Sequence, residues 1–198
     1  MMRKTISLIA ILLTLFIGVS DAQVTNVRSG LVTLYGFDPL QSSLCFNDGG
    51  SGYVFENGKV VNRSSHLAFD IYEKDSLTAG IQGGERGYII DLGTAVDLRQ
   101  KYGYRETVGN GQGYASLHIA DNNEVVILRN YDQQSYQSLK EAEALFEADR
   151  QAASAPVKLG HIYLVRIQRK QPEKDILAKV LVVAYRPGES VVLRWTAL

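Results

Sequence analysis

The C-terminal stretch, residues 161–198, constrains the fold more than any other part of the chain. It contains three runs rich in β-branched and aromatic residues, separated by the turn sequences KQPEK and PGE, which predicts an antiparallel three-strand meander. The middle run, DILAKVLVVAYR, is apolar at odd and even positions alike. Its two faces carry Val180, Val182 and Ala184 on one side and Leu181, Val183 and Tyr185 on the other. A strand of this kind lies at the centre of a sheet that is covered on both faces.

Turn residues divide the preceding part of the chain into short segments. Asn57-Gly58, between YVFE and KVV, accepts the positive φ angles of a type I′ turn and predicts a hairpin. Pro187-Gly188 has the residues of a type II turn, with fixed φ first and positive φ second. These turns favour an antiparallel arrangement.

Three further runs predict strands. The run LAFDIYE alternates in polarity, which places on one side Leu67, Phe69 and Ile71. GYIIDLG is a short apolar strand closed by glycines. YASLHIADNNEVVILRNY predicts a second hairpin, which turns through residues 121–123.

One segment predicts a helix instead. SLKEAEALFEADRQAAS has apolar residues at helical spacing: Leu139, Ala142, Leu145, Phe146 and Ala153. Ser138 and Glu141 have the spacing of a capping box, and Pro156 prevents continuation of the helix. Such a helix packs on a sheet or binds a partner, and we expect the first.

These patterns predict a mainly β fold: a single antiparallel β-sandwich or curved sheet with one covering α-helix. We expect this domain over residues 31–198, preceded by an N-terminal extension over residues 23–30. Residues 1–22 have a different character, that of a targeting segment.

The N-terminus has the pattern of a secretory signal peptide. Arg3 and Lys4 precede an apolar run over residues 6–19, and Ser20 and Ala22 are the small residues of a cleavage site. The run is shorter than the roughly 20 apolar residues that span a bilayer, so an uncleaved anchor is the less favoured alternative. We expect cleavage near Ala22, a secreted or periplasmic protein, and no transmembrane segment in the mature chain.

Charge and cysteine content narrow the function classes. Without residues 1–22 the chain keeps 19 of its 21 basic and 20 of its 21 acidic residues, a net charge near −1. Nucleic-acid binding requires a basic surplus, so we expect no nucleic-acid partner. Cys45 is the only cysteine, which excludes an internal disulfide, and we expect it to be a buried apolar residue.

No catalytic motif is present in full. GGSGY lacks the final glycine and the strand-to-helix context of a nucleophile elbow, and GNGQG lacks the helix of a dinucleotide loop. Asp70 and Asp91 lie on or beside predicted strands, and two carboxylates that meet can perform acid–base hydrolysis. We expect them instead at the surface or in turn hydrogen bonds. We therefore predict no catalytic residue and no metal site.

The three histidines are His66, His118 and His161. None lies two or four residues from another, so no local metal pair is encoded. His118 shares a side with Ser116 and Ala120 and is expected to face outward. His161 begins an apolar strand, and we expect a strand-end residue that hydrogen-bonds to the backbone.

The chain has eleven tyrosines, several of them near predicted loops. Exposed aromatic rings on a β scaffold suit small ligands or protein partners. The densest patch is RNYDQQSYQ. The candidate contact residues are Tyr131, Tyr136 and Tyr114.

Two blocks of the chain resemble HmuY-like exported proteins. FENGKVVNRSSHLAFDIYEKD followed by AGIQGG is similar to their hairpin, strand and glycine-rich stretch, and IYLVRIQRKQPEKDILAKVLVVAYRPGESVVLRW is similar to their C-terminal strands. The resemblance covers about a third of the chain and implies an exported β-rich domain. Some members of that family capture haem through two histidines. Here the family's lipoprotein cysteine is absent, Leu67 and Ala68 stand near its Trp-Asp pair, and no ligating histidine carries over.

The sequence thus predicts a non-catalytic module of the cell envelope or secreted space that binds a small ligand or a protein and needs no cofactor. The alternative is haem binding, with two ligands drawn from the three histidines. A hydrolase that uses Asp70 and Asp91 is the third hypothesis.

Overall fold

The computed structural model describes residues 28–81, 85–103, 114, 116–120, 124–130, 135–147, 152–171 and 175–198. The strands are β1 (Ser29–Tyr35), β2 (Ser43–Leu44), β3 (Tyr53–Glu56), β4 (Lys59–Asn62), β5 (Leu67–Phe69), β6 (Ser76–Ala79), β7 (Arg86–Thr94), β8 (Leu117–Ile119), β9 (Val125–Asn130), β10 (Ser135–Ser138), β11 (Ser154–Pro156), β12 (His161–Gln168), β13 (Ile176–Arg186) and β14 (Ser190–Ala197). Two helices are described, α1 (Ala95–Tyr102) and α2 (Lys140–Glu143). The predicted mainly β fold is confirmed.

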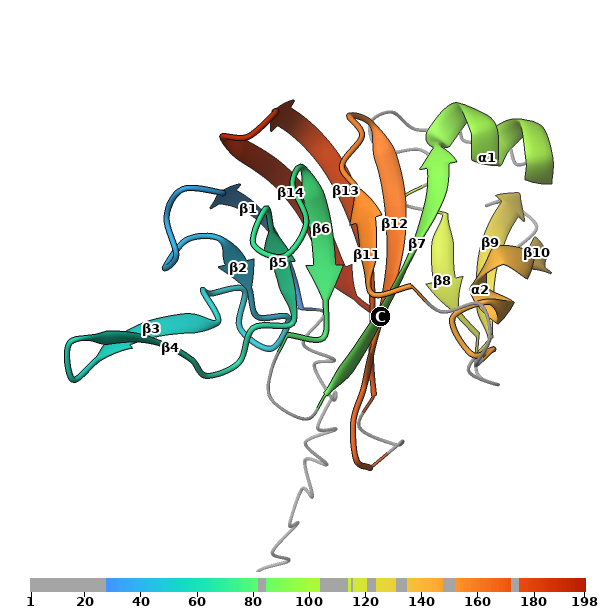
Figure 1. The fold of residues 1–198 in the computed structure, drawn as a ribbon. Coiled ribbons are helices and arrows are strands. Elements are labelled where there is room, and N and C mark those ends of the chain that lie inside the picture. The colour runs from blue at the N-terminus through green and yellow to red at the C-terminus, as the bar shows by residue number, and fades with distance from the viewer. Residues whose placement is uncertain are drawn as a thin grey trace, which may run out of the picture.

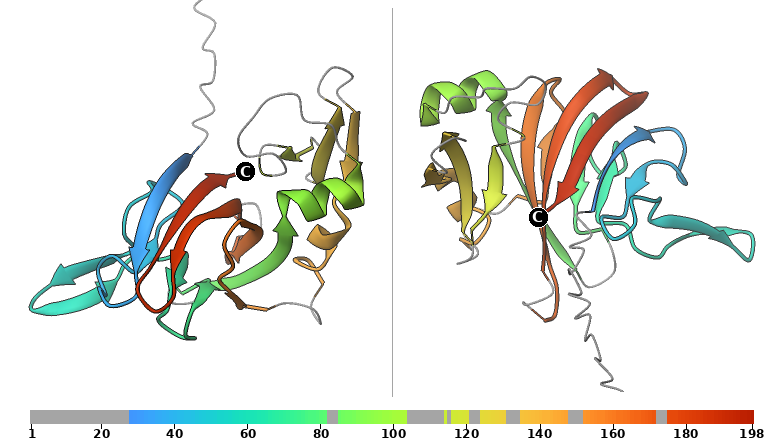
Figure 2. Two further views of the ribbon diagram at one scale, coloured as in Figure 1. Left: turned by 90° about the horizontal axis from the view of Figure 1, so that it is seen from above. Right: turned by 180° about the vertical axis from the view of Figure 1, so that it is seen from behind.

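A five-stranded antiparallel sheet in the order β1-β14-β13-β12-β7 forms the middle of the molecule. The sheet β11-β6-β5-β2 covers one face, and the sheet β10-β9-β8 with both helices covers the other (Figure 1). β3 and β4 form a separate ribbon that extends away from these layers (Figures 1 and 2). Within the described residues, no helix is long and apolar enough to cross a membrane.

The predicted meander is confirmed, and β13 is its central strand. Its alternate residues enter two cores. Ala178, Val180 and Val182 join the first core, between the central sheet and β5–β6. Leu177 and Leu181 pack against the second core, beneath β8–β9 and the helices. The apolar character of both faces therefore reflects two covering layers.

A β-bulge changes the side of the sheet toward which the last side chains of β13 point. The ladder to β14 shifts between Val182 and Ala184, which leaves Val183 exposed. The extra residue turns Tyr185 toward the first core, where its ring lies 6.3 Å from that of Phe69. The prediction that Tyr185 faces away from Val182 was wrong, because a bulge inserts one residue into the period of two.

The strand predicted over LAFDIYE is shorter than expected. β5 ends at Phe69, Asp70 has a φ of 59°, and all three strand residues are buried. Ile71 lies in the following bend and is exposed. The alternation of this run thus does not describe a two-faced strand.

The predicted turns are confirmed. Asn57 and Gly58 have φ angles of 50° and 77°, and Glu56 pairs with Lys59 on either side of them. Gly188 has a φ of 67°, and the Glu189 N–H donates to the Arg186 carbonyl across the turn. β8 and β9 pair as the second hairpin, while residues 121–123 lie outside the described part.

The helices differ most from expectation. α2 spans only Lys140–Glu143, and its N-cap Leu139 makes no side-chain capping bond. The Leu139 N–H donates to the Val125 carbonyl, so the β10–β9 ladder continues through Ser138 and prevents the predicted capping box. Residues 148–151 of the predicted helix lie outside the described part.

The longer helix, α1, was not predicted, although its start signal is present in the sequence. The Asp97 N–H donates to Thr94 Oγ1, and the Thr94 N–H donates to Asp97 Oδ2, which forms a complete capping box. Gly103, with a φ of 63°, terminates the helix. Its eight residues are short enough to be missed by a search for long apolar periodicity.

Candidate functional site

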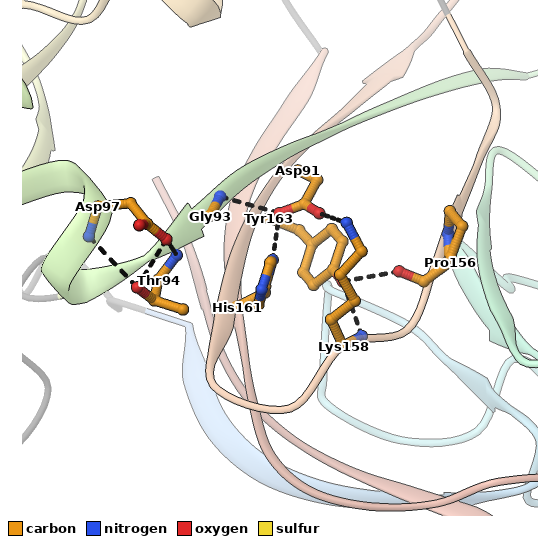
Figure 3. Close-up of polar contacts among 8 residues, drawn as sticks. All are labelled: Asp91, Gly93, Thr94, Asp97, Pro156, Lys158, His161 and Tyr163. Carbon is orange, nitrogen blue, oxygen red and sulfur yellow. Dashed lines mark hydrogen bonds and ion pairs between the residues drawn. The ribbon is translucent and has the colours of Figure 1, made fainter.

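A histidine–carboxylate cluster lies where β7 and β12 pair (Figure 3). Asp91 Oδ1 lies 2.8 Å from His161 Nδ1 and accepts the N–H of Gly93 at 2.9 Å. The other carboxylate oxygen, Oδ2, accepts a hydrogen bond from Lys158 Nζ at 2.9 Å. One carboxylate thus joins β7, the first residue of β12 and the segment before it.

Local backbone geometry brings these groups together. The β12–β7 ladder shifts between His161 and Tyr163, and the preceding Gly160 has a φ of 76°. The buried Tyr163 hydroxyl donates to the Pro156 carbonyl at 2.7 Å and accepts the Lys158 N–H at 3.0 Å. Tyr163 therefore fixes the segment that presents Lys158 to Asp91.

The charges of the cluster support this arrangement. Burial raises the pKa of Asp91, but hydrogen bonds from His161, Lys158 and Gly93 outweigh burial and hold that pKa below its ordinary value. Burial and the nearby Asp91 carboxylate raise the pKa of the Tyr163 phenol, so it stays protonated and can donate to Pro156. The cluster contains an ionised carboxylate at neutral pH.

A carboxylate on histidine Nδ1 is also how many enzymes orient a general base. His161 is partly exposed, and its Nε2 has no hydrogen-bond partner among the described residues. In that same part of the chain, no serine, threonine or cysteine is hydrogen-bonded to this histidine. The contacts shown link β7 to the start of β12 and to the segment before it. His161 is a strand-end residue as predicted, but it bonds a carboxylate rather than the backbone.

We predict that Asp91→Asn lowers the free energy of unfolding by about 1–2 kcal/mol. The amide keeps the volume of the carboxylate but loses its charge and places an N–H donor near Lys158 or His161. Urea unfolding followed by the fluorescence of Trp195, the only tryptophan, measures the change. The control is Asp48→Asn, whose carboxylate is exposed and accepts the N–H of the nearby Gly50, and it is expected to change stability by less than about 0.5 kcal/mol. Equal effects of the two changes contradict the structural role of Asp91.

The three candidate haem ligands lie in different places. His66 is fully buried on the loop before β5 and contacts Arg169, which follows the end of β12. His161 begins β12, so about 25 Å of strand separates it from Arg169. His118 is exposed, as predicted, and it lies on β8, across the central sheet from the first core. The structure does not bring these histidines together.

The candidate contact tyrosines also differ. Tyr136 is 53% exposed, and its ring packs edge-on against His118 with centroids 6.2 Å apart. Tyr114 is only 2% exposed, and its hydroxyl lies 2.7 Å from Thr196 Oγ1, so its predicted place on a contact surface is corrected. Tyr131 lies outside the described residues.

Tyr114 is buried because it covers a buried charge. Lys179 of β13 donates from Nζ to the carbonyls of Tyr114 and Leu117, at 2.7 and 2.8 Å. The ammonium lies 4.7 Å from the centre of the Tyr114 ring. Burial, with a smaller effect of Arg194, lowers the pKa of Lys179 to about 8. Tyr114 thus packs around a buried charge in the interior and is not part of an exposed contact surface.

The two candidate catalytic carboxylates have separate partners. Asp70 Oδ1 accepts the N–H of Asp75 at 2.6 Å inside a turn, whereas Asp91 belongs to the histidine cluster. The expected turn hydrogen bond is therefore present at Asp70. No group of three or more possible metal ligands gathers within the described residues. Cys45 is buried, as predicted.

An exposed apolar surface, which sequence reasoning missed, lies on and beside the β3–β4 ribbon. Phe55 and Val60 are directly paired across the ribbon and are 65% and 42% exposed. The other members of this aromatic strip lie in nearby loops, and the whole strip comprises Phe37, Phe55, Val60, Ile71 and Tyr72. The alternating residues that predict a hairpin do not reveal which face lacks a covering layer.

Contacts connect the three segments that carry the aromatic strip. The Tyr53 side chain, on the same face of β3 as Phe55, lies next to Tyr72. Burial and this contact raise the pKa of Tyr53 to about 12. A Cβ atom at Gly36, next to Phe37, would lie 2.7 Å from Asp70 Oδ2, so the two loops touch. The three segments that carry the strip therefore lie side by side.

The chain matches no known family model, no curated protein and no solved structure in the three comparisons made.

Proposed function

We propose that this protein is exported, is processed near Ala22, and acts as a non-catalytic module that binds a protein partner through the aromatic strip. The exposed Phe55–Val60 pair carries the proposal. The signal-peptide pattern over residues 1–22 supports export. The resemblance to HmuY-like proteins agrees with an exported β scaffold and is part of the same proposal.

The position of the pair supports a role in association. Exposed apolar patches on soluble domains mark interaction surfaces, because water disfavours them unless a partner covers them. Aromatic side chains supply much of the energy of such interfaces. The β3–β4 ribbon extends from the body of the molecule (Figure 2), so Phe55 and Val60 are accessible to a large partner. Two isolated strands are only marginally stable, and a partner that covers them adds stability.

The experiment uses the processed chain as immobilised bait for the envelope and secreted proteins of its source. N-terminal sequencing of the exported bait is expected to begin at Gln23. We expect one partner to be retained by the wild-type chain and its affinity to fall at least about tenfold with Phe55→Ser and Val60→Ser combined. Loss of two apolar anchors removes burial that forms only in the complex.

A matched control distinguishes binding through the aromatic strip from nonspecific hydrophobic binding. Val96 on α1 is 49% exposed and lies on another layer, so Val96→Ser is expected to leave retention unchanged. The fluorescence of Trp195 checks that every variant is folded. Retention that survives the double change, or that Val96→Ser lowers equally, rules out the aromatic strip as the binding surface.

A further inference from the structure

β10 is an edge strand among the strands that the structure describes. It ends the three-stranded sheet β10-β9-β8, and its register pairs Ser138 with Val126. The Leu139 N–H donates to β9, so by alternation along an antiparallel ladder the N–H and C=O groups of Tyr136 and Ser138 point away from β9. Among the described strands, none pairs with that side of β10. This side can accept another strand.

A small pocket lies at the C-terminal end of β10. Its volume is about 220 Å³, and Ser138 of β10 lines it together with the start of β9 and α2. Its apolar lining includes the buried side chains of Val125, Leu139 and Ala142. Phe146 forms a partly exposed wall, and the Arg166 guanidinium lies 4.6 Å from its ring centre. The volume suits one long side chain better than a whole small-molecule ligand.

The charge of the pocket indicates which kind of side chain it can bind. Glu143 lines it, and none of the described lining residues is basic. The cation over the Phe146 ring, Arg166, is paired with Asp175 Oδ2, which accepts hydrogen bonds from its Nη2 and Nε at 2.7 and 3.0 Å. An apolar lining beside the Glu143 carboxylate complements an aliphatic stem with a cationic head, which is the chemistry of arginine and lysine.

We propose that β10 and this pocket bind an extended peptide segment, which adds to β10 as a strand and places a basic side chain in the pocket. The backbone of the segment pairs with Tyr136 and Ser138, and its arginine or lysine lies beside Glu143. The exposed rings of Tyr136 and His118 offer an aromatic surface to a neighbouring side chain. This site is separate from the aromatic strip and goes beyond the proposed function.

The test titrates the processed chain, labelled with ¹⁵N, with two blocked pentapeptides, TVRVT and TVEVT. We expect TVRVT to give saturable shifts at the amides of Tyr136 and Ser138 and to slow their hydrogen exchange. TVEVT is expected to bind at least about fivefold more weakly, because its carboxylate faces Glu143. Glu143→Lys removes this preference, whereas Glu73→Lys, a change at an exposed glutamate outside the pocket, retains it.

A pair of changes at one residue tests the strand pairing. Ser138→Pro removes the N–H that points to the free edge and is expected to abolish TVRVT binding, while Ser138→Ala keeps the N–H and the binding. Trp195 fluorescence confirms folding of each variant. Three results overturn the proposal: no saturation with millimolar TVRVT, equal affinity for both peptides, or unchanged binding by Ser138→Pro. Binding of n-butylguanidinium as tight as that of TVRVT also overturns it, because the pocket is then a site for free cations. None of these outcomes involves the aromatic strip.

Discussion

Gly87→Ala is expected to lower the free energy of unfolding by about 3 kcal/mol or more. Gly87 lies in β7, and a Cβ atom there would be 2.0 Å from the Ala79 carbonyl carbon and 2.2 Å from the Gly80 nitrogen. Both neighbours are backbone atoms where the chain leaves β6, so no side chain can rotate away. The added methyl group must separate the central sheet from its cover.

Urea unfolding, followed by Trp195 fluorescence, measures this effect. Gly50→Ala is the matched control. Gly50 is exposed, and the atom nearest to a Cβ added there would be an Asp48 side-chain oxygen, 3.4 Å away. We expect that control to change stability by less than about 0.5 kcal/mol. If Gly87→Ala yields no folded protein at all, refolding is attempted at low temperature with stabilising osmolytes. Failure to refold under these conditions also agrees with the clash. Wild-type stability of Gly87→Ala contradicts it.

Acid is expected to destabilise the protein through His66. Its side chain is fully buried, and Nδ1 accepts the Phe46 N–H at 3.0 Å, so the neutral ring carries its proton on Nε2. Burial, followed by the charge of Arg169, lowers the pKa of His66 to about 4. A second proton would have to displace the Phe46 hydrogen bond.

The sign of the effect follows from proton linkage. The unfolded histidine titrates near its ordinary pKa of about 6.5, so between about pH 6.5 and pH 4 the unfolded state binds a proton that the folded state excludes. Stability contributed by neutral His66 is complete above about pH 6.5 and is lost as the pH falls toward 4. The loss amounts to about 3 kcal/mol.

Urea unfolding of wild type and His66→Gln at a series of pH values isolates this contribution from those of the carboxylates. Glutamine can still accept the Phe46 N–H but does not titrate, so the stability difference between the two proteins is expected to shift by about 3 kcal/mol from pH 7 to pH 4. NMR titration of the His66 ring in the folded wild type gives an independent value, expected near 4. A constant stability difference, or a ring that titrates near 6.5, contradicts the prediction.

Local patterns predicted those features that depend on neighbouring residues. Asn57-Gly58 and Pro187-Gly188 formed the expected turns, because their φ preferences act within four residues. The apolar runs of the meander gave β12, β13 and β14 in the expected order. The same local reasoning failed at Ser138, where a bond from the next residue to β9 outweighed a helix start.

The candidate sites were predicted only in part. Asp91 and His161 were each considered, but their pairing depends on the β7–β12 register and on the shift near His161. Tyr136 is exposed as expected, whereas Tyr114 is buried because Lys179, far away in the sequence, requires its carbonyl. Both outcomes depend on which segments the fold brings together.

By itself the sequence determined the mainly β class, the tight turns and the doubly covered central strand, since each follows from side-chain periodicity and backbone preference. Only the tertiary structure decided that Phe55 lacks a cover, that Gly87 meets the backbone of β6, and that β10 has a free edge. A residue's periodicity gives the face on which it lies. What stands opposite that face is fixed by contacts between segments that are distant in the chain.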